Sequence, residues 1–217
     1  MARLHPPDKS RLLDLPPCPG LALADIMVPR SEAEHQAAWD DLRAHRHLGF
    51  DTESRPTFVK GEESRGPDVV QFATPTRAYV LQLRHAESTA LARAVLTSPH
   101  IVKVGFGLQQ DRSQLRQRLG LEVQACLDLD LVFHRMGYPR SIGIKAAVAI
   151  AFGQRFVKSK RVTTTNWANA RLEPRQLVYA ANDAWVALQV MRWHDPASLD
   201  AVLASVMADP AALVALR

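Results

Sequence analysis

The chain has 217 residues, of which 47% are hydrophobic, and it carries a formal net charge of +5 at pH 7. The hydrophobic content excludes a disordered chain, and no apolar run reaches the roughly 20 residues that a membrane-spanning helix needs. Because the N-terminus has no apolar stretch of the signal-peptide type, we expect a cytoplasmic protein with no membrane partner. The positive charge suits a polyanionic partner but does not identify one.

Residues 1–30 are expected to form an extended arm, and residues 31–217 to form a single domain. Residues 6–19 contain five prolines, which lack the backbone donor that regular structure requires. After the arm, Ser31 and Glu34 form a capping-box pattern, which predicts a helix over about residues 32–45.

Strand and helix patterns alternate through the rest of the chain. Short apolar runs bounded by turn residues predict strands at 47–52, 68–73, 78–83, 101–104 and 125–129. Helices are predicted at 88–97, 108–119, 142–152 and 174–193, with a further pair after Pro196 and Pro210. This order predicts an α/β fold in which helices flank a mixed central sheet of five strands.

Two acidic residues stand at the end of the first predicted strand of this sheet. Asp51 and Glu53 are two apart, so a strand conformation places both carboxylates on one face. Close carboxylates repel each other unless a cation lies between them or one is protonated. A strand end frayed into water, where the repulsion is screened, is the alternative interpretation.

Asp111 and Asp183 are the other acids that stand out from the solvated surface. Asp111 follows a strand and a glycine-containing bend, at the start of a helix, where it would either bind a ligand or favour the helix dipole. Tyr179 and Asp183 share one face of the helix predicted at 174–193, whose surface is mostly apolar. A carboxylate there is costly unless it is paired or metal-bound, and a structural Tyr–Asp hydrogen bond is the alternative.

A common chemistry explains why four acids would converge. Phosphodiester hydrolysis requires an attacking hydroxide and relief of charge on the leaving oxygen, and two divalent cations meet both needs. Mg²⁺ and Mn²⁺ prefer oxygen ligands, so carboxylates suit them better than histidine or cysteine. We therefore expect Asp51, Glu53, Asp111 and Asp183 to hold two cations, Mg²⁺ or Mn²⁺.

Three segments carry a resemblance to a known family. The segments 50–53 (FDTE), 104–111 (VGFGLQQD) and 179–183 (YAAND) resemble the three exonuclease motifs of the DEDD superfamily, in order. Tyr179, four residues before the last aspartate, marks the DEDDy branch, and the ribonuclease D and Werner-type exonucleases match best. The resemblance covers about residues 34–193. It implies a ribonuclease H-like fold and removal of nucleoside 5'-monophosphates from a 3' end.

The resemblance also implies roles for the matched residues. Asp51, Glu53 and Asp183 would bind the metal that activates water, and Asp51 would bridge to a second metal that Asp111 helps to hold. Tyr179 would orient the attacking water. The segment 54–67 is charged and has no counterpart that we can align; it follows the catalytic strand and so is a candidate to touch substrate.

Several residues near the motifs are candidates for substrate binding, each with a structural alternative. Lys158, Lys160 and Arg161 belong to a basic cluster that would neutralise phosphates or form a solvated loop. Trp167 and Phe106 would stack bases, although a tryptophan in the core is favoured over stacking for Trp167. The backbone of Thr52, between two acids, would meet the terminal nucleotide.

We expect a 3'-5' exonuclease acting on single-stranded RNA or DNA 3' ends. The first alternative is an enzyme specialised for very short RNA, down to dinucleotides, as in small members of the superfamily. The second is a non-catalytic nucleic-acid-binding domain on the same fold. The intact set of four acids and Tyr179 argues against this second alternative, and the sequence does not indicate an oligomeric state.

Overall fold

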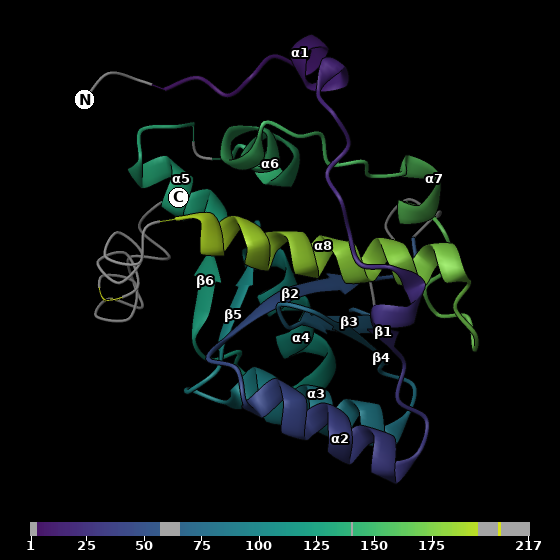
Figure 1. The fold of residues 1–217 in the computed structure, drawn as a ribbon. Helices are drawn as coiled ribbons and strands as arrows, with labels where there is room; N and C mark the ends of the chain where they lie inside the picture. Colours follow the sequence, from purple (N-terminus) through teal and green to yellow (C-terminus); the bar gives the residue numbers. More distant parts are fainter. Residues whose placement is uncertain (1–3, 57–65, 140, 195–203, 205–217) are drawn as a thin grey trace.

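The computed structural model describes residues 4–56, 66–139, 141–194 and 204. Figure 1 shows its layers: a central sheet, helices α2, α3 and α4 on one face, and the long helix α8 across the other, with α6 stacked beyond α8. In the part of the chain described, no helix is both long and apolar enough to span a bilayer. The predicted helices after Pro196 and Pro210 fall outside the described residues.

The sheet has six strands in the order β1-β4-β3-β2-β5-β6. Strands β2, β3 and β4 form an antiparallel meander, whereas β1, β5 and β6 pair in parallel with their neighbours. The strands are β1 (Ile26–Met27), β2 (His47–Glu53), β3 (Val69–Ala73), β4 (Ala78–Gln82), β5 (Val102–Gly105) and β6 (Cys126–Asp128).

The α/β architecture is confirmed, but the predicted number of five strands was wrong. The additional strand is β1, which pairs with the edge strand β4 through Ile26 and Met27. A strand of two residues is too short to show the alternation of apolar and polar side chains by which strands are recognised. The five predicted strands are all present, and no end is shifted by more than one residue.

The helices that flank the sheet follow the sequence pattern closely. Ser31 and Glu34 form the predicted capping box of α2, and the side-chain oxygen of Gln176 accepts the N–H of Glu173 at 2.9 Å where α8 begins. The α-helices are α1 (Lys9–Asp14), α2 (Glu32–Arg43), α3 (Ala86–Thr97), α4 (Gln109–Leu119), α5 (Leu129–Arg135), α6 (Gly143–Phe152), α7 (Lys160–Thr163) and α8 (Pro174–Trp193).

The N-terminal segment is more structured than the extended arm that the prolines suggested. It contains α1, the 3-10 turn η1 (Leu23–Asp25) and strand β1. Between α1 and η1 the chain passes across α8 (Figure 1). There the N–H of Cys18 donates to the carbonyl of Arg155 at 2.9 Å, and the N–H of Leu21 donates to Asn182 Oδ1 at 2.7 Å.

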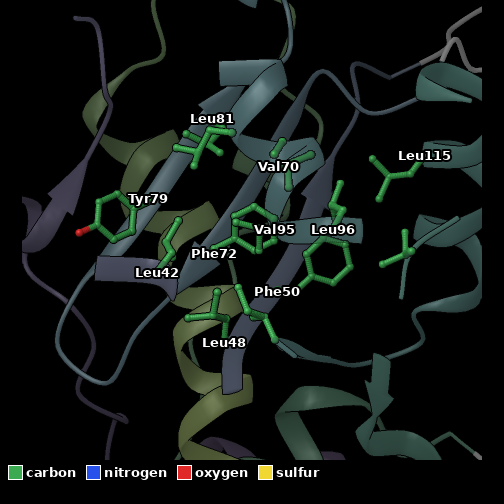
Figure 2. Packing of buried hydrophobic residues seen from close by; sticks show 14 of the residues in the cluster. Leu42, Leu48, Phe50, Val70, Phe72, Tyr79, Leu81, Val95, Leu96 and Leu115 are labelled. Atoms are coloured by element: carbon green, nitrogen blue, oxygen red, sulfur yellow. The ribbon is translucent and has the colours of Figure 1, made fainter. Parts of the chain in front are cut away.

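Each face of the sheet is packed against helices by buried hydrophobic residues. On the α2–α3 side, Phe50 of β2 and Phe72 of β3 stack with ring centroids 5.8 Å apart (Figure 2). Leu48 lies on the same face as Phe50, two residues away (Figure 2). Since successive strand residues alternate in direction, Gly49, Asp51 and Glu53 must point to the opposite face, toward α8.

Gly49 allows α8 to lie unusually close to β2. A Cβ atom added at Gly49 would be 2.0 Å from the carbonyl oxygen of Ala184, which is backbone and cannot be moved aside cheaply. Ala184 is the next residue after Asp183, so this close contact sets the distance between Asp183 and the acids of β2.

We predict that Gly49→Ala destabilises the protein by about 2–4 kcal/mol, because β2 and α8 must separate to admit the methyl group. The free energy of unfolding from denaturant titration measures the loss. Gly120→Ala is the control: nothing lies within 4 Å of its added Cβ, so only its φ of 63° is unfavourable, at about 1 kcal/mol. A smaller loss for Gly49→Ala than for Gly120→Ala would contradict the close-approach argument.

Candidate active site

Three carboxylates meet where β2 ends beneath α8. Asp51 and Glu53 reach this point from alternate positions of β2, and Asp183 reaches it from the middle of α8. Ligand oxygens of the three residues all lie within 4.8 Å of one another. The structure therefore brings together three of the four acids that the sequence singled out.

Asp111 joins the site from the opposite side of β2. It lies in the first turn of α4, and its Oδ1 accepts a hydrogen bond of 2.5 Å from the hydroxyl of Thr52. The N–H of Thr52 donates to Asp51 Oδ1 at 2.9 Å. Thr52 thus ties Asp111 to the acids of β2, whereas its predicted contact with a terminal nucleotide stays a prediction.

Burial and mutual repulsion make the acids reluctant to ionise together. Burial raises the pKa of Glu53 to about 9, and the charges of Asp51 and Asp183 add to this rise. Burial also raises the pKa of Asp51 well above its ordinary value, with further increases from Asp111 and Asp183. Bringing several such groups together is unfavourable unless positive charge accompanies them.

The site fits a divalent cation. Asp183 Oδ1 is buried and has no hydrogen-bond partner among the described residues. The donors around it are carboxylate oxygens, which hard cations such as Mg²⁺ and Mn²⁺ prefer. An unpartnered carboxylate oxygen beside two further carboxylates is the arrangement that a cation would satisfy.

Lys158 supplies positive charge to the site. Its Nζ lies 2.6 Å from Asp183 Oδ2 and 5.2 Å from the ring centroid of Tyr179. Burial alone would lower the pKa of Lys158, but the carboxylates of Asp183 and Asp51 outweigh this effect and raise it. The sequence placed Lys158 in a phosphate-binding cluster; the structure pairs it with a predicted metal ligand.

Tyr179 presents its hydroxyl beside the acids. The hydroxyl lies 2.9 Å from Thr163 Oγ1, within hydrogen-bond distance. Burial, followed by the charge of Asp183, raises the pKa of the Tyr179 phenol, so the group stays protonated at neutral pH. A protonated hydroxyl can donate one hydrogen bond and accept another.

The predicted substrate-binding residues differ in their exposure. Phe106 is half-buried, and Lys160 and Arg161 are exposed on α7, so all three can meet a ligand. Trp167 is 0% exposed, and its indole N–H donates to the carbonyl of Thr163 at 3.3 Å. Trp167 therefore occupies the core, as the sequence analysis favoured, and neither face of its ring is accessible to a base.

Asp128 supports the site and was given no role in the sequence analysis. Its carboxylate accepts the N–H groups of Gly107 and Leu108 at 3.0 and 2.9 Å, and so fixes the bend that precedes Asp111. An acid directly after an apolar strand was the available signal, the same one that drew attention to Asp51. Both hydrogen bonds depend on β6 lying beside β5, and the sequence does not show this pairing.

A cavity of about 680 Å³ reaches the site at Asp183. Its walls come from the N-terminal segment at Cys18 and Leu21, from Phe156 between α6 and α7, from Arg161 of α7, and from α8. Tyr179 and Asp183 form part of its lining. The cavity gives a ligand the size of a nucleotide access to one edge of the site.

The fold and the carboxylate cluster define a ribonuclease H-like domain with a candidate cation site. Residues 26–192 match the profile of a family described as 3'-5' exonuclease. The chain therefore belongs to the 3'-5' exonuclease family, and the resemblance to the ribonuclease D and Werner-type group is confirmed.

Individual relatives agree with this assignment. A 3'-5' exonuclease of Arabidopsis thaliana is 27% identical over 149 residues, which cover 68% of this chain and 50% of the relative. The chain thus spans about half the length of that relative. The Nibbler EXO domain of Aedes aegypti has a similar fold, with a TM-score of 0.67 at 23% identity over 80% of this chain and 88% of that chain.

A third similar protein is ribonuclease D of Trypanosoma brucei in complex with RNA U12. Its TM-score is 0.67 at 19% identity, and the alignment covers 85% of this chain and 64% of that chain. Identity at this level shows a shared fold.

We predict that the metal-free protein loses stability as pH rises from about 4 to about 9. Acids with a raised pKa bind more protons in the folded state than in the unfolded state, so their stabilisation is complete at low pH and disappears as they ionise. Lys158, whose pKa is also raised, stays charged over this range. Melting temperatures measured in chelator at several pH values test the slope.

Glu53→Gln is expected to flatten this pH dependence, because it removes a carboxyl with a pKa of about 9. Glu87→Gln, at an exposed position in the first turn of α3, is the control and should keep the wild-type slope above pH 5. Saturating Mn²⁺ should also reduce the wild-type slope. Equal slopes for wild type and Glu53→Gln in chelator would show that the cluster does not carry the effect.

Proposed function

We propose that this protein is a 3'-5' exonuclease that hydrolyses single-stranded RNA or DNA from the 3' end with two divalent cations. The observation that carries the proposal is the convergence of Asp51, Glu53 and Asp183, whose ligand oxygens lie within 4.8 Å of one another. In addition, Asp183 Oδ1 has no hydrogen-bond partner among the described residues. Family membership supports the same activity.

The acids would divide between two cation positions. Asp51, Glu53 and Asp183 would hold one cation, and Asp51 and Asp111 would hold the other. When bound, Mg²⁺ or Mn²⁺ would lower the pKa of a coordinated water and offset the charge on the leaving 3' oxygen. Burial and then the charge of Asp111 raise the pKa of Asp51, and this proximity of the two carboxylates supports a second cation between them.

The protein's own groups would position the attacking water and the strand. The protonated hydroxyl of Tyr179, held by Thr163, can orient a water beside Asp183. Lys160 and Arg161 would neutralise phosphates of the strand, and the exposed part of Phe106 would contact a base. The product would be a nucleoside 5'-monophosphate.

RNA and DNA are both proposed substrates. The complex of Trypanosoma brucei ribonuclease D with RNA U12, which shares the fold, supports testing RNA first. The exposed positive residues of α7 would contact phosphates in either polymer, so they support both equally.

We predict that the protein shortens 5'-labelled strands stepwise from the 3' end in Mn²⁺ or Mg²⁺, and that chelator abolishes cleavage. Asp51→Asn and Asp183→Asn should each lower the rate at least about 100-fold, because each removes a cation ligand. The control Asp14→Asn changes an exposed carboxylate of α1 and should cleave like wild type.

The length of the strands distinguishes the alternatives. RNA and DNA of graded length, from two nucleotides upward, should all be degraded if the enzyme acts on single strands generally. A strong preference for dinucleotides would instead establish the specialised oligoribonuclease function. Binding of the strands without cleavage in either metal would contradict the enzymatic proposal.

A further inference from the structure

Lys158 stands apart from the other basic residues near the site because its charge is turned inward. It belongs to the stretch between α6 and α7, and its side chain is 30% exposed, whereas that of Asp183 is 2% exposed. Its Nζ contacts Asp183 Oδ2 at 2.6 Å, and the face of the Tyr179 ring lies 5.2 Å away. Lys160, two residues later, is exposed.

The same carboxylate is thus a candidate ligand for two different cations. Asp183 Oδ2 pairs with the ammonium of Lys158, while Oδ1 has no partner among the described residues. Asp51 and Glu53 lie beside this pair and add negative charge. A buried carboxylate cluster of this kind is relieved by bound protons or by a neighbouring positive charge, including in the time before a metal ion arrives.

We propose that Lys158 is an internal counter-ion that stabilises the acid cluster before a metal binds and competes with the divalent cation for Asp183. This inference rests on the proposed function, because it takes the acid cluster to be a cation site. In this role Lys158 positions the proposed metal ligand Asp183, in addition to any contact that it makes with phosphate.

The surroundings of Lys158 allow its ammonium to leave Asp183. Residues 157–159 form no helix or strand, and Val157 beside it is 66% exposed. A lysine side chain carries its charge on a flexible four-carbon stem, so it can turn away without moving α8. Once displaced, the ammonium remains beside the acids, where a phosphate of a bound strand would be an alternative partner.

The competition has a measurable consequence of definite sign. A positive charge next to a cation site weakens cation binding through Coulomb repulsion, so its removal should strengthen binding. A lysine that merely ties the stretch between α6 and α7 to α8 would have no such effect. In that case its loss would lower stability and leave cation affinity unchanged or reduced.

The first experiment titrates Mn²⁺ into the intact protein by calorimetry, without nucleic acid. Lys158→Gln should bind Mn²⁺ about tenfold more tightly than wild type. Its melting temperature in chelator should fall, and saturating Mn²⁺ should restore it to the wild-type value. Lys158→Arg, which keeps a cation, and Lys160→Gln, which changes net charge by the same amount, should bind Mn²⁺ like wild type. An unchanged or weaker affinity in Lys158→Gln would overturn the proposal.

A second measurement needs no variant. Amine-reactive labelling of the wild-type protein, quantified by mass spectrometry, should modify Lys158 slowly in chelator and several-fold faster in Mn²⁺, as the ammonium leaves Asp183. The labelling rate of Lys160 should not change. Equal rates for Lys158 with and without Mn²⁺ would contradict the displacement.

These results separate the inference from the proposed nuclease activity. Tight Mn²⁺ binding by Lys158→Gln, together with absence of strand cleavage by wild type, would refute the activity alone. Normal metal-dependent cleavage by wild type, together with unchanged Mn²⁺ affinity in Lys158→Gln, would refute the inference alone.

Discussion

Repulsion among buried carboxylates is the constraint on which this structure depends. Ligand oxygens of Asp51, Glu53 and Asp183 lie within 4.8 Å of one another in a site that excludes most water, where like charges interact strongly. A protein gains no stability from such an arrangement without a compensating cation or bound protons. We therefore attribute the acids to the cations that they are proposed to bind, and the arrangement of the neighbouring residues to the need to hold the acids together.

The fold enforces this closeness through two elements far apart in the sequence. Strand β2 supplies two acids on one face, and α8 passes directly over that face because Gly49 has no side chain. On the other side of β2, Phe50 anchors the strand in the core. The apolar surfaces of β2 and α8 thus stabilise the contact between these two elements, whereas repulsion among their carboxylates opposes it. Lys158 offsets part of this opposition at Asp183.

Much of the fold and most of the site could be predicted, because their signals are local. Asp51 and Glu53 share a face whenever residues 47–53 form a strand, and Pro174 marks the start of α8 in sequence and structure alike. The motif around Asp183 gave the fourth acid and Tyr179. The convergence of the elements followed from the resemblance to the exonuclease family.

Features that depend on neighbours distant in the chain could not be predicted. The strand β1 is too short to show a pattern and exists because the edge of β4 accepts it. The role of Asp128 depends on β6 lying beside β5. A cluster of basic residues was visible, but the sequence does not show that Lys158 alone of its lysines faces inward to Asp183 while Lys160 faces solvent.

The most direct test of the account is the anomalous diffraction of a crystal of this protein grown with Mn²⁺. The account predicts an anomalous peak coordinated by Asp51, Glu53 and Asp183, and a second peak between Asp51 and Asp111. Full occupancy by Mn²⁺ elsewhere, with no peak among these acids, would contradict the claim that their repulsion is balanced by divalent cations.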